Sequence, residues 1–436
     1  MTDGNRNVEK ARADACIVGG GPAGLMLGLL LAKRGARVIV LEGHPNFDRE
    51  FRGEVLQPST SRLLDQLGLL EYIFAQPHLK LTDGLLRVRG RVAGSLDFRK
   101  ISPEYPYAIW MPQPIFLEAL AKKAATFPSF TIWMGAHVNE LIEENGAVVG
   151  VRGKRHGKEP FEVRADVVVA ADGRFSAVRR LGGFETEYES HDFDLLWFVI
   201  DPPPNFKKTI YFSMGTIPSL LMLPKYPDQI QVGLLLQKDE WKDWKKLGVP
   251  AVAERLRRLD PVFADFADKL RDFTPFFPLA VIIALVKDWA RDGLLLIGDA
   301  AHTMSPAGAI GVNVALSTAA VAAQEIYPRL GCGTIPRDAL ANVQRIREPD
   351  VRNLHSLQRG VGRVLQGAGR RASILRWVAP IMVPIVARTF IMPRLQRRLF
   401  FGVPLPPLDP AFGFRSEAAS PEATTASRQP PASVSR

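Results

Sequence analysis

The chain has 436 residues, more than one hydrophobic core usually supports, so the sequence predicts two closely packed domains. Hydrophobic residues make up 47% and charged residues 23%, as in ordinary globular proteins, and two cysteines exclude a disulfide framework and favour a reducing cytoplasm. The net charge of +11 does not indicate a nucleic acid partner, because most of the excess lies between Arg345 and Arg398, where there are twelve arginines and only two acids.

The N-terminal part of the sequence predicts a βαβ unit. Residues 1–12 are polar and are expected to be disordered. Residues 15–18 are typical of a buried strand and residues 22–34 of a helix. Residues 37–41 are typical of a second strand, which ends at Glu42. Residues 15–32 are uncharged, but the glycine turn between strand and helix would interrupt a membrane span, so no cleaved or spanning segment is predicted.

The turn between this strand and helix carries the sequence GGGPAG, a dinucleotide-binding fingerprint. Gly19 allows the tight turn, Gly21 lets the backbone approach a pyrophosphate, and Gly24 lets helix and strand pack closely. The helix start offers amides and a positive dipole end to phosphates, and Glu42 can accept hydrogen bonds from ribose hydroxyls. The residues of this turn that are expected to bind the cofactor are Gly19, Gly21, Pro22, Ala23 and Gly24.

Two later apolar runs predict further strands of the same parallel sheet. Residues 166–170, apart from Asp166 at their start, and residues 294–297 are short and continuously apolar, as strands buried on both faces are. Both are followed by an acid next to a glycine, which is Asp172 in the first case and Asp299, after Gly298, in the second. A carboxylate at such a strand end can hydrogen-bond the polyol chain of a cofactor.

The region between these strands and the C-terminal region have different patterns. From about Asp194 to Leu285, apolar runs alternate with turn signals, which predicts a mostly antiparallel sheet that forms one wall of a substrate cavity. From Arg345 onward the pattern is helical. The predicted α/β organisation is residues 1–12 disordered, 13–190 and 286–345 nucleotide-binding with part of 75–115 on the substrate side, 191–285 the inserted sheet, 346–414 helical, and 415–436 a disordered tail.

Taken together and in this order, the motifs resemble the FAD-dependent aromatic hydroxylases of the para-hydroxybenzoate hydroxylase fold, the group A flavoprotein monooxygenases. GGGPAG with Glu42 is similar to their site for the ADP part of FAD, and ADGRFSAVRR with Asp172 to their DG motif. GDAAH, with Gly298 and Asp299, is similar to their flavin ribityl motif. Further FAD contacts implied by the resemblance are Arg52, Gln113, Gly311 and Asn313, and the loop expected near the flavin ring carries Pro306, Gly308 and Gly311.

The resemblance also implies a Rossmann-like FAD-binding domain and a reaction. NAD(P)H reduces FAD, O2 adds to the flavin C4a carbon, and the resulting hydroperoxide hydroxylates an aromatic or polyketide-like small molecule. No catalytic side chain is assigned, because the flavin carries the chemistry. Since the sequence has one glycine fingerprint, NAD(P)H is expected to dock transiently near the DG motif.

Three residues depart from the family pattern after GDAAH. Ala309 and Ile310 replace the usual glycine and glutamine, and Ser317 stands where an aspartate is common. These changes bear on the position of the isoalloxazine ring. His302, inside the motif, is expected to satisfy local hydrogen bonds rather than to act as a base.

Other functions on this fold remain as alternatives. One is an oxidoreductase that hydroxylates, epoxidises or reduces a lipophilic quinone or isoprenoid, and another is a non-catalytic flavoprotein. A halogenase is disfavoured, because Trp241 and Trp244 lack the tryptophan-x-tryptophan spacing. Residues 374–401 combine apolar runs with arginines and are too short between charges to span a bilayer. They are interpreted as a lid over the site, with peripheral membrane attachment of a cytoplasmic protein as the alternative.

Overall fold

The structure is a computed structural model of the whole chain. It describes residues 8–48, 54–88, 91–204, 206–214, 218–306 and 308–366, together with 389, 394, 396–398, 400, 405 and 407–414. Three predictions therefore lie outside the described residues: the FAD contact of Arg52, the disordered tail 415–436, and most of the proposed lid 374–401.

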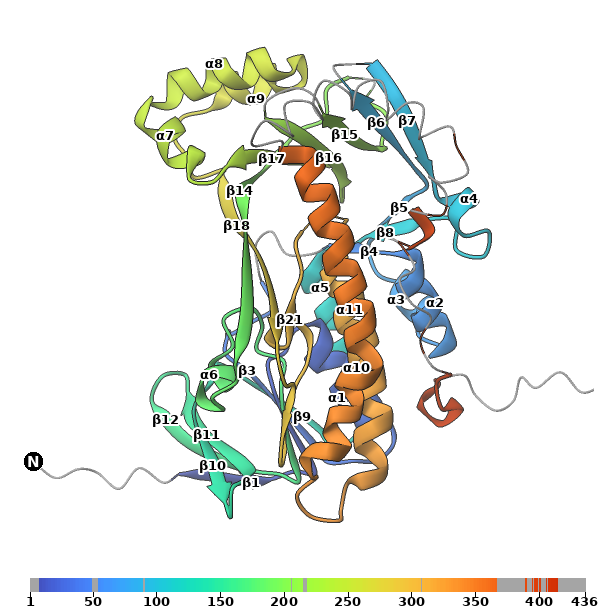
Figure 1. Cartoon of the computed structure of the whole chain (residues 1–436), viewed down its shortest axis with the longest axis vertical. Coiled ribbons are helices and arrows are strands. Elements are labelled where there is room, and N and C mark those ends of the chain that lie inside the picture. The colour runs from blue at the N-terminus through green and yellow to red at the C-terminus, as the bar shows by residue number, and fades with distance from the viewer. Residues whose placement is uncertain are drawn as a thin grey trace, which may run out of the picture.

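A six-stranded sheet forms the lower half of the molecule in Figure 1. Its strands pair in parallel, except for an antiparallel edge strand. In spatial order they are β19 (Ala290–Arg291), β20 (Leu294–Leu296), β13 (Val167–Ala170), β2 (Ala15–Val18), β3 (Val38–Glu42) and β9 (Phe130–Met134). Strands β2, β3, β13 and β20 are buried along their whole length, as their continuous apolar sequences predict.

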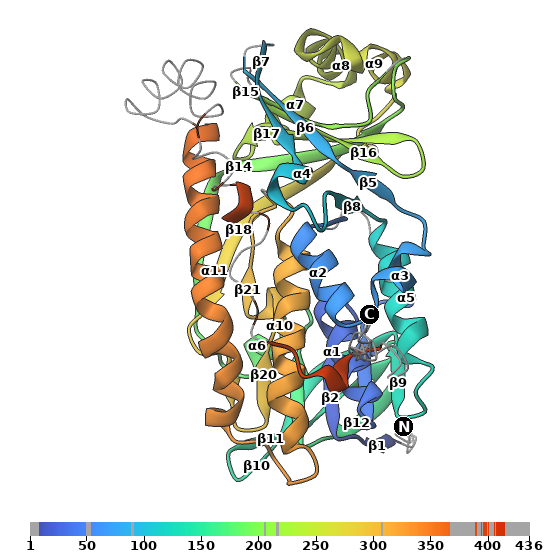
Figure 2. The ribbon, with the colours of Figure 1, turned by 90° about the vertical axis from the view of Figure 1, so that its right-hand side faces the viewer.

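Four helices lie side by side against this sheet, in the order α5, α1, α10 and α11 (Figure 2). Their bounds are α5 (Gln113–Ala124), α1 (Pro22–Lys33), α10 (Gly311–Ile326) and α11 (Arg337–Gln366). Helix α11 begins eight residues before the predicted helical region and runs from the lower half toward the upper half of the molecule (Figure 1). Among the residues that can be described, no helix has the length and apolarity needed to cross a bilayer.

A second, four-stranded sheet packs against the first, in the order β1 (Glu9–Arg12), β12 (Glu159–Arg164), β11 (Ala147–Arg155) and β10 (Ala136–Glu144). Strand β1 corrects one prediction, because residues 9–12 are ordered rather than disordered. They pair in parallel with β12, from Glu9 opposite Phe161 to Arg12 opposite Arg164. These residues are polar because β1 is an exposed edge strand that buries little surface.

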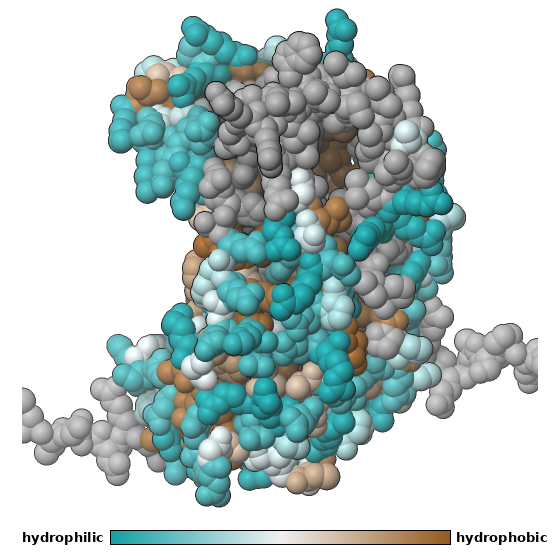
Figure 3. Space-filling model, viewed as in Figure 1, coloured by the Kyte–Doolittle hydropathy of each residue, from teal (hydrophilic) through white to brown (hydrophobic). Residues whose placement is uncertain are grey.

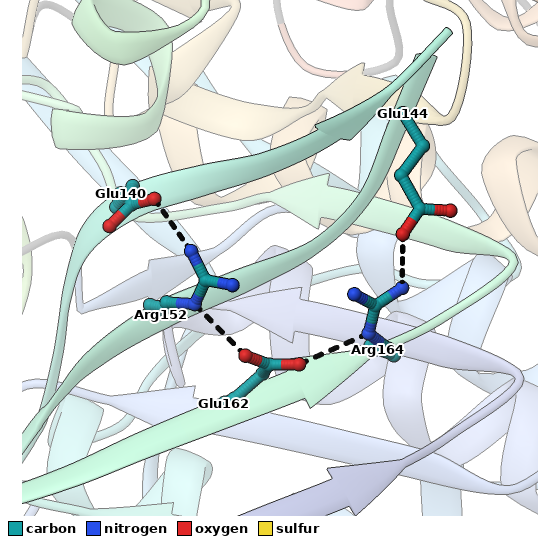
Figure 4. Close-up of polar contacts among 5 residues, drawn as sticks. All are labelled: Glu140, Glu144, Arg152, Glu162 and Arg164. Carbon is teal, nitrogen blue, oxygen red and sulfur yellow. Dashed lines mark hydrogen bonds and ion pairs between the residues drawn. The ribbon is translucent and has the colours of Figure 1, made fainter.

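The outer surface of this sheet carries a chain of ion pairs (Figure 4). Arg152 contacts Glu140 at 2.8 Å and Glu162 at 2.9 Å, and Arg164 contacts Glu162 at 3.0 Å and Glu144 at 2.6 Å. The hydrogen bonds from Arg152 and Arg164 hold the pKa of Glu162 below its usual value. Exposed pairs of this kind contribute little to stability, so they define a charged surface rather than a site.

The upper half of Figure 1 holds an eight-stranded sheet, antiparallel apart from one pair. In spatial order its strands are β21 (His302–Thr303), β18 (Phe277–Val286), β14 (Thr186–Ile200), β17 (Gln229–Gln237), β16 (Ser219–Lys225), β15 (Ile210–Met214), β6 (Asp83–Val88) and β7 (Arg91–Asp97). The predicted α/β fold with an inserted, mostly antiparallel sheet is confirmed.

The two faces of the eight-stranded sheet have different partners. Alternate residues such as Leu196 and Phe198 point to an outer cluster closed by three helices. These helices are α7 (Glu240–Lys246), α8 (Val249–Leu259) and α9 (Ala264–Lys269). The other residues, such as Leu195 and Trp197, point inward to a small sheet of β4 (Val55–Leu56), β8 (Ala108–Trp110) and β5 (Leu79–Leu81).

The inward cluster is called the inner layer below. It consists of Val55, Leu81, Phe98, Ile101, Ala108, Trp110, Phe193, Leu195, Trp197, Leu223 and Val281. The remaining short helices are α2 (Pro58–Gln66), α3 (Leu70–Phe74), α4 (Phe98–Ile101) and α6 (Ala177–Leu181). The inner layer lies between the two halves of the molecule, next to the strand ends that carry the sequence motifs.

Candidate active site

Four buried strands of the six-stranded sheet end at the same edge. Ala170, at the end of β13, is in register with Val18 of β2 and with Leu296 of β20, and Val18 is in register with Leu41 of β3. The residues that follow these strands are therefore neighbours, although they come from distant parts of the sequence. The predicted site residues gathered at this edge are Gly19, Glu42, Asp172, Gly298 and Asp299.

The glycine turn after β2 is too crowded for side chains at two positions. Gly19 has φ +111°, and a Cβ on it would lie 2.3 Å from the carbonyl oxygen of Ala171. A Cβ on Gly24 would lie 1.9 Å from the carbonyl oxygen of Gly19. Both contacts are with backbone, which cannot give way, so the turn and the close packing of α1 require glycine, as the sequence predicted.

The start of α1 is open to a ligand. Gly21 precedes the helix as its N-cap, no side chain caps the helix, and Pro22 fills the first helical position, where no amide hydrogen is needed. Ala23 packs toward the other motif, because a Cβ added to Gly298 would lie 3.1 Å from the Ala23 Cβ. The amides of this helix start and its dipole suit a phosphate group.

Glu42 is held by the glycine turn. Its side chain is 3% exposed, its Oε2 accepts a hydrogen bond from the amide of Gly20 at 2.7 Å, and its Oε1 accepts one from the amide of His44 at 2.9 Å. The carboxylate is thus fixed beside the turn, where the sequence placed it. Its contact with a ribose stays a prediction.

Asp172 carries an unused oxygen at the same edge. Its Oδ2 accepts hydrogen bonds from the amides of Ala177 at 2.8 Å and Val178 at 3.1 Å, at the start of α6. Its Oδ1 is buried and has no hydrogen-bond partner within the described part of the chain. Burial raises the pKa of this carboxyl. A buried acceptor without a partner is costly, so Oδ1 is a candidate contact for a bound cofactor.

The loop from Gly298 to Gly311 joins the two halves of the molecule. It leaves β20, passes the half-buried Asp299, enters the eight-stranded sheet as β21, and ends at the first residue of α10. Gly298 and Gly308 have φ values of +58° and +80°, so both positions favour glycine. Gly311 has room for a Cβ, since its nearest neighbour would lie 3.7 Å away.

Ala309, one of the departures from the family pattern, adopts a conformation that normally favours glycine. Its φ is +51°, in the left-handed region, and its amide donates to the carbonyl of Pro306 at 3.0 Å. Its side chain packs against the inner layer. The loop therefore has the turn that a glycine would allow at this position, and the methyl group of Ala309 lies against the inner layer.

Asn313 ties this loop to β4 and α2. Its Oδ1 accepts hydrogen bonds from the Gln57 amide at 2.7 Å and the Thr60 hydroxyl at 2.5 Å. Its Nδ2 donates to the carbonyls of Ala309 at 2.8 Å and Val55 at 3.3 Å. The carboxamide is committed to protein groups, so its observed role is positioning, and a contact of this side chain with FAD has no support in the geometry.

Gln57 is a site residue that sequence reasoning missed. It is 3% exposed, its Nε2 donates to the carbonyl of Gly308 at 2.6 Å, and its Oε1 is buried without a partner among the described residues. The available signal was a polar residue directly before Pro58, at a junction of strand and helix. Gln113, which was predicted, is 7% exposed and begins α5 next to the small sheet.

His302 is buried in the core, but the local hydrogen bonds predicted for it are only partly present, because its Nδ1 has no partner among the described residues. It is 1% exposed, lies against Trp289 with ring centroids 5.0 Å apart, and has its Nε2 3.3 Å from the Thr318 hydroxyl. Burial lowers its pKa to about 3, so the ring is neutral near pH 7. A neutral imidazole packed in the core is not placed to act as a base.

Helix α11 holds the first part of the loop. Gln358 accepts from the Ser305 amide at 3.1 Å and donates to the Ser305 carbonyl at 2.8 Å. His355 lies with its Nε2 3.2 Å from the carbonyl of Thr303. A buried ion pair of Arg347 and Asp350, at 2.8 Å, lies on the same helix. The loop is thus fixed from α11 on one side and from Asn313 on the other.

The substrate side is the inner layer. Trp110 and Trp197 belong to it, whereas Trp133 packs against Phe161 in the core of the lower half. Four apolar residues that pack against the inner layer are only partly buried: Leu221, Leu235, Phe277 and Leu279. Their exposure indicates space beside the inner layer, and Figure 3 shows hydrophobic residues at the floor of a recess in the upper half.

These groups fit FAD. The glycine-lined strand edge matches an extended dinucleotide, and the open start of α1 matches its pyrophosphate. Two buried acceptors that find no partner in the described part of the chain, Asp172 Oδ1 and Gln57 Oε1, lie along the edge and beside the loop. Among the residues searched in the structure, no group of His, Cys, Asp and Glu side chains could hold a metal ion.

Comparison with known proteins points the same way. The FAD binding domain family matches residues 12–350. The chain is 36% identical to 6-methylpretetramide 4-monooxygenase of Streptomyces rimosus, over 90% of this chain and 93% of that protein. It is 26% identical to protoasukamycin 4-monooxygenase of Streptomyces nodosus subsp. asukaensis, over 82% and 89%. The fold is similar to that of p-nitrophenol 4-monooxygenase from Pseudomonas putida, with TM-score 0.75, 21% identity, and coverage of 91% and 100%.

Proposed function

The chain belongs to the FAD binding domain family and is an FAD-dependent monooxygenase, and we propose that it hydroxylates a fused-ring, polyketide-like aromatic molecule with NAD(P)H and O2. The observation that carries this proposal is the course of the loop from Gly298 to Gly311. The loop begins where β20 ends, at the edge that carries the glycine and acid motifs, and packs against the inner layer through Ala309. The relatives named above support the substrate class, because two of them act on 6-methylpretetramide and protoasukamycin according to their names.

The strand edge would hold FAD along its length. The start of α1 at Gly21 would bind the pyrophosphate, Glu42 a ribose, and Asp172 and Asp299 the polar groups between ribose and flavin. Bound FAD supplies the redox chemistry, taking two electrons from NAD(P)H and activating O2 so that one oxygen atom reaches the substrate.

The residues of the chain contribute positioning and electrostatics. The start of α10 has no side-chain cap among the described residues, and the positive end of the helix dipole there would stabilise negative charge on the flavin ring. Asn313 and Gln358 fix the loop, so this helix start needs no rearrangement during the reaction. The apolar inner layer would place an aromatic substrate on the other side of the loop and exclude water.

The proposal is tested by following oxygen atoms. The FAD-loaded protein is mixed with NAD(P)H, labelled O2 and a panel of hydroxylated naphthalenes, anthracenes and tetracenes. We expect one panel class to accelerate NAD(P)H oxidation and to gain one labelled oxygen. NAD(P)H oxidation that no aromatic compound accelerates, with peroxide as the sole product, would contradict the proposed hydroxylation.

The role of residues 374–401 as a lid is also a proposal. Its support lies in the described Phe400, whose ring packs 5.2 Å from that of Phe98 in the inner layer. The competing idea, peripheral membrane contact, draws on the exposed Arg394, Arg397 and Arg398. Sedimentation with vesicles of phosphatidylglycerol separates the two: a lid predicts that the protein stays in the supernatant at physiological salt, and cosedimentation would favour membrane contact.

A further inference from the structure

Glu54 is a buried carboxyl that lies outside the nucleotide-binding edge, which is the edge of the six-stranded sheet where β2, β3, β13 and β20 end. It lies directly before β4, and its carbonyl accepts a hydrogen bond from the amide of Met111 at 2.9 Å, so it is fixed beside β8. Its side chain is 9% exposed, and its Oε2 has no hydrogen-bond partner within the described part of the chain. A buried carboxylate oxygen without a partner is costly, so it indicates a ligand that completes it.

Two other polar groups lie at the same border of the inner layer. Lys225 ends β16 and, by alternation, shares the inward face with Leu221 and Leu223. Its Nζ lies 5.7 Å from the ring centroid of Trp110, and its charge acts on Glu54. The Nε1 of Trp110 is itself buried without a partner among the residues that the structure describes. Glu54, which precedes Val55 of the inner layer, is therefore close to one cation, Lys225, which is itself close to one unpaired donor, Trp110.

Resting on the function proposed above, we propose that Glu54 is a catalytic residue that accepts the hydrogen bond, and during oxygen transfer the proton, of a phenolic or enolic hydroxyl of the substrate. The O–H bond of the substrate breaks and an O–H bond of the carboxyl forms. The electron pair left on the substrate oxygen enters the ring and makes the ring carbon more nucleophilic. The step needs no oxidant beyond the monooxygenase reaction itself.

The charges around Glu54 suit this proton transfer. Before the transfer, the positive charge of Lys225 acts on the carboxylate of Glu54, and after it the same charge would favour the phenolate of the substrate. Burial raises the pKa of Glu54 to about 7, and Lys225 opposes this rise, so the carboxylate is the main form above that pH. A substrate carboxylate would be repelled by Glu54, whereas a neutral hydroxyl matches it.

A binding experiment tests the contact without turnover. The FAD-loaded protein is dialysed to equilibrium against 1-naphthol and against its methyl ether, 1-methoxynaphthalene, at pH 6 and pH 8. At pH 8 the natural protein should bind the phenol about tenfold or more tightly than the ether, as a hydrogen bond to a charged group predicts. The preference should be smaller at pH 6. E54Q keeps only a neutral acceptor, so its preference should be much smaller and the same at both pH values, and E71Q, a control at an exposed glutamate of α3, should match the natural protein.

A second variant keeps the proposal testable if E54Q loses its fold. K225M removes the cation and leaves the acceptor, and the pKa of Glu54 should rise because Lys225 no longer lowers it. The preference for 1-naphthol should therefore fall at pH 8 and return at higher pH. The proposal is overturned if E54Q keeps the preference, or if the natural protein binds phenol and ether equally or binds neither.

Kinetics then separate this proposal from the proposed function. With the aromatic substrate that gains labelled oxygen, E54Q should lower kcat by about 10²- to 10⁴-fold while retaining its FAD, the range expected for loss of a general base. If no aromatic compound gains oxygen, the hydroxylase function fails, and the dialysis still decides whether Glu54 binds a hydroxyl. If hydroxylation proceeds and E54Q behaves as the natural protein does, the role of Glu54 fails alone.

Discussion

The nucleotide-binding edge and the inner layer are built on different physical constraints. At the edge, side chains are excluded by backbone: a Cβ on Gly24 would lie 1.9 Å from a carbonyl oxygen. In the inner layer, a Cβ on Gly233 would meet the ring of Trp197, a side chain, at 2.8 Å. A backbone neighbour cannot move without breaking the sheet, but a side chain can rotate. At the edge only glycine fits, whereas the side chains of the inner layer can differ with the substrate.

The two regions also differ in how they treat polar groups. The edge satisfies most of its groups internally, as Glu42 does with two backbone amides. The border of the inner layer leaves Glu54 and Trp110 with unpaired polar atoms among the described residues. Glu42 therefore has a role in holding the glycine turn, whereas Glu54 and Trp110 keep polar atoms that a ligand could pair.

The largest expected effect is at the edge. G24A should lower the free energy of unfolding by more than about 4 kcal/mol or prevent folding, because the new methyl group overlaps the carbonyl oxygen of Gly19. FAD content and urea unfolding measure this. G360A is the matched control, since Gly360 is exposed in α11 with open space around it, and it should stabilise the protein by about 0.5–1 kcal/mol. A G24A protein that folds and holds FAD normally would remove the steric argument.

The next effect concerns the attachment of the loop to α11 and depends on pH. Burial lowers the pKa of His355 to about 4, below the unfolded value near 6.5, so the folded state holds this ring neutral. Its contribution is fully present above pH 6.5 and is lost as pH falls toward 4, which amounts to about 3 kcal/mol. H355Q keeps a donor for the carbonyl of Thr303 and should flatten this acid loss in urea unfolding between pH 7 and pH 4.5. H137Q, at an exposed histidine, is the control and should lose stability as the natural protein does.

Much of the edge could be predicted because its information is local. Strand, glycine turn, helix and terminal acid follow one another from residue 15 to Glu42, and each later strand also ends at its own acid. Parallel pairing then brings these ends together, as the register of β2, β3, β13 and β20 shows. Strand β1 was missed because an edge strand buries little and its sequence is polar.

The inner layer could not be predicted in the same way. Both faces of the inserted sheet are apolar, so alternation along β14 does not tell which face meets the substrate. The hydrogen bond from the Gln57 amide to Asn313 joins residues 256 positions apart, and no local sequence pattern predicts it. No local pattern marks Glu54 either, because its burial depends on the pairing of β4 with β8.

A smaller effect is expected within the inner layer. G233A should push the ring of Trp197 and lower the free energy of unfolding by about 1–3 kcal/mol, the usual range for overpacking. FAD binding should be unchanged, whereas KM for the aromatic substrate should rise, because Trp197 belongs to the inner layer. Loss of FAD together with the rise in KM would mean that the two regions are not independent.

The smallest effect joins the two regions at Ala309. This residue holds a left-handed φ of +51°, which costs an L-residue about 1–2 kcal/mol, while its methyl group packs against the inner layer. In A309G the strain disappears, but packing and some unfolded-state entropy are lost, so the free energy of unfolding should rise by no more than about 1 kcal/mol. N145G, at another left-handed residue in an exposed turn, is the control and should change less, since asparagine tolerates this region. If the methyl group helps to position substrate, A309G should form more peroxide per NAD(P)H consumed than the natural protein does. Unchanged coupling would restrict the role of Ala309 to the backbone of the loop.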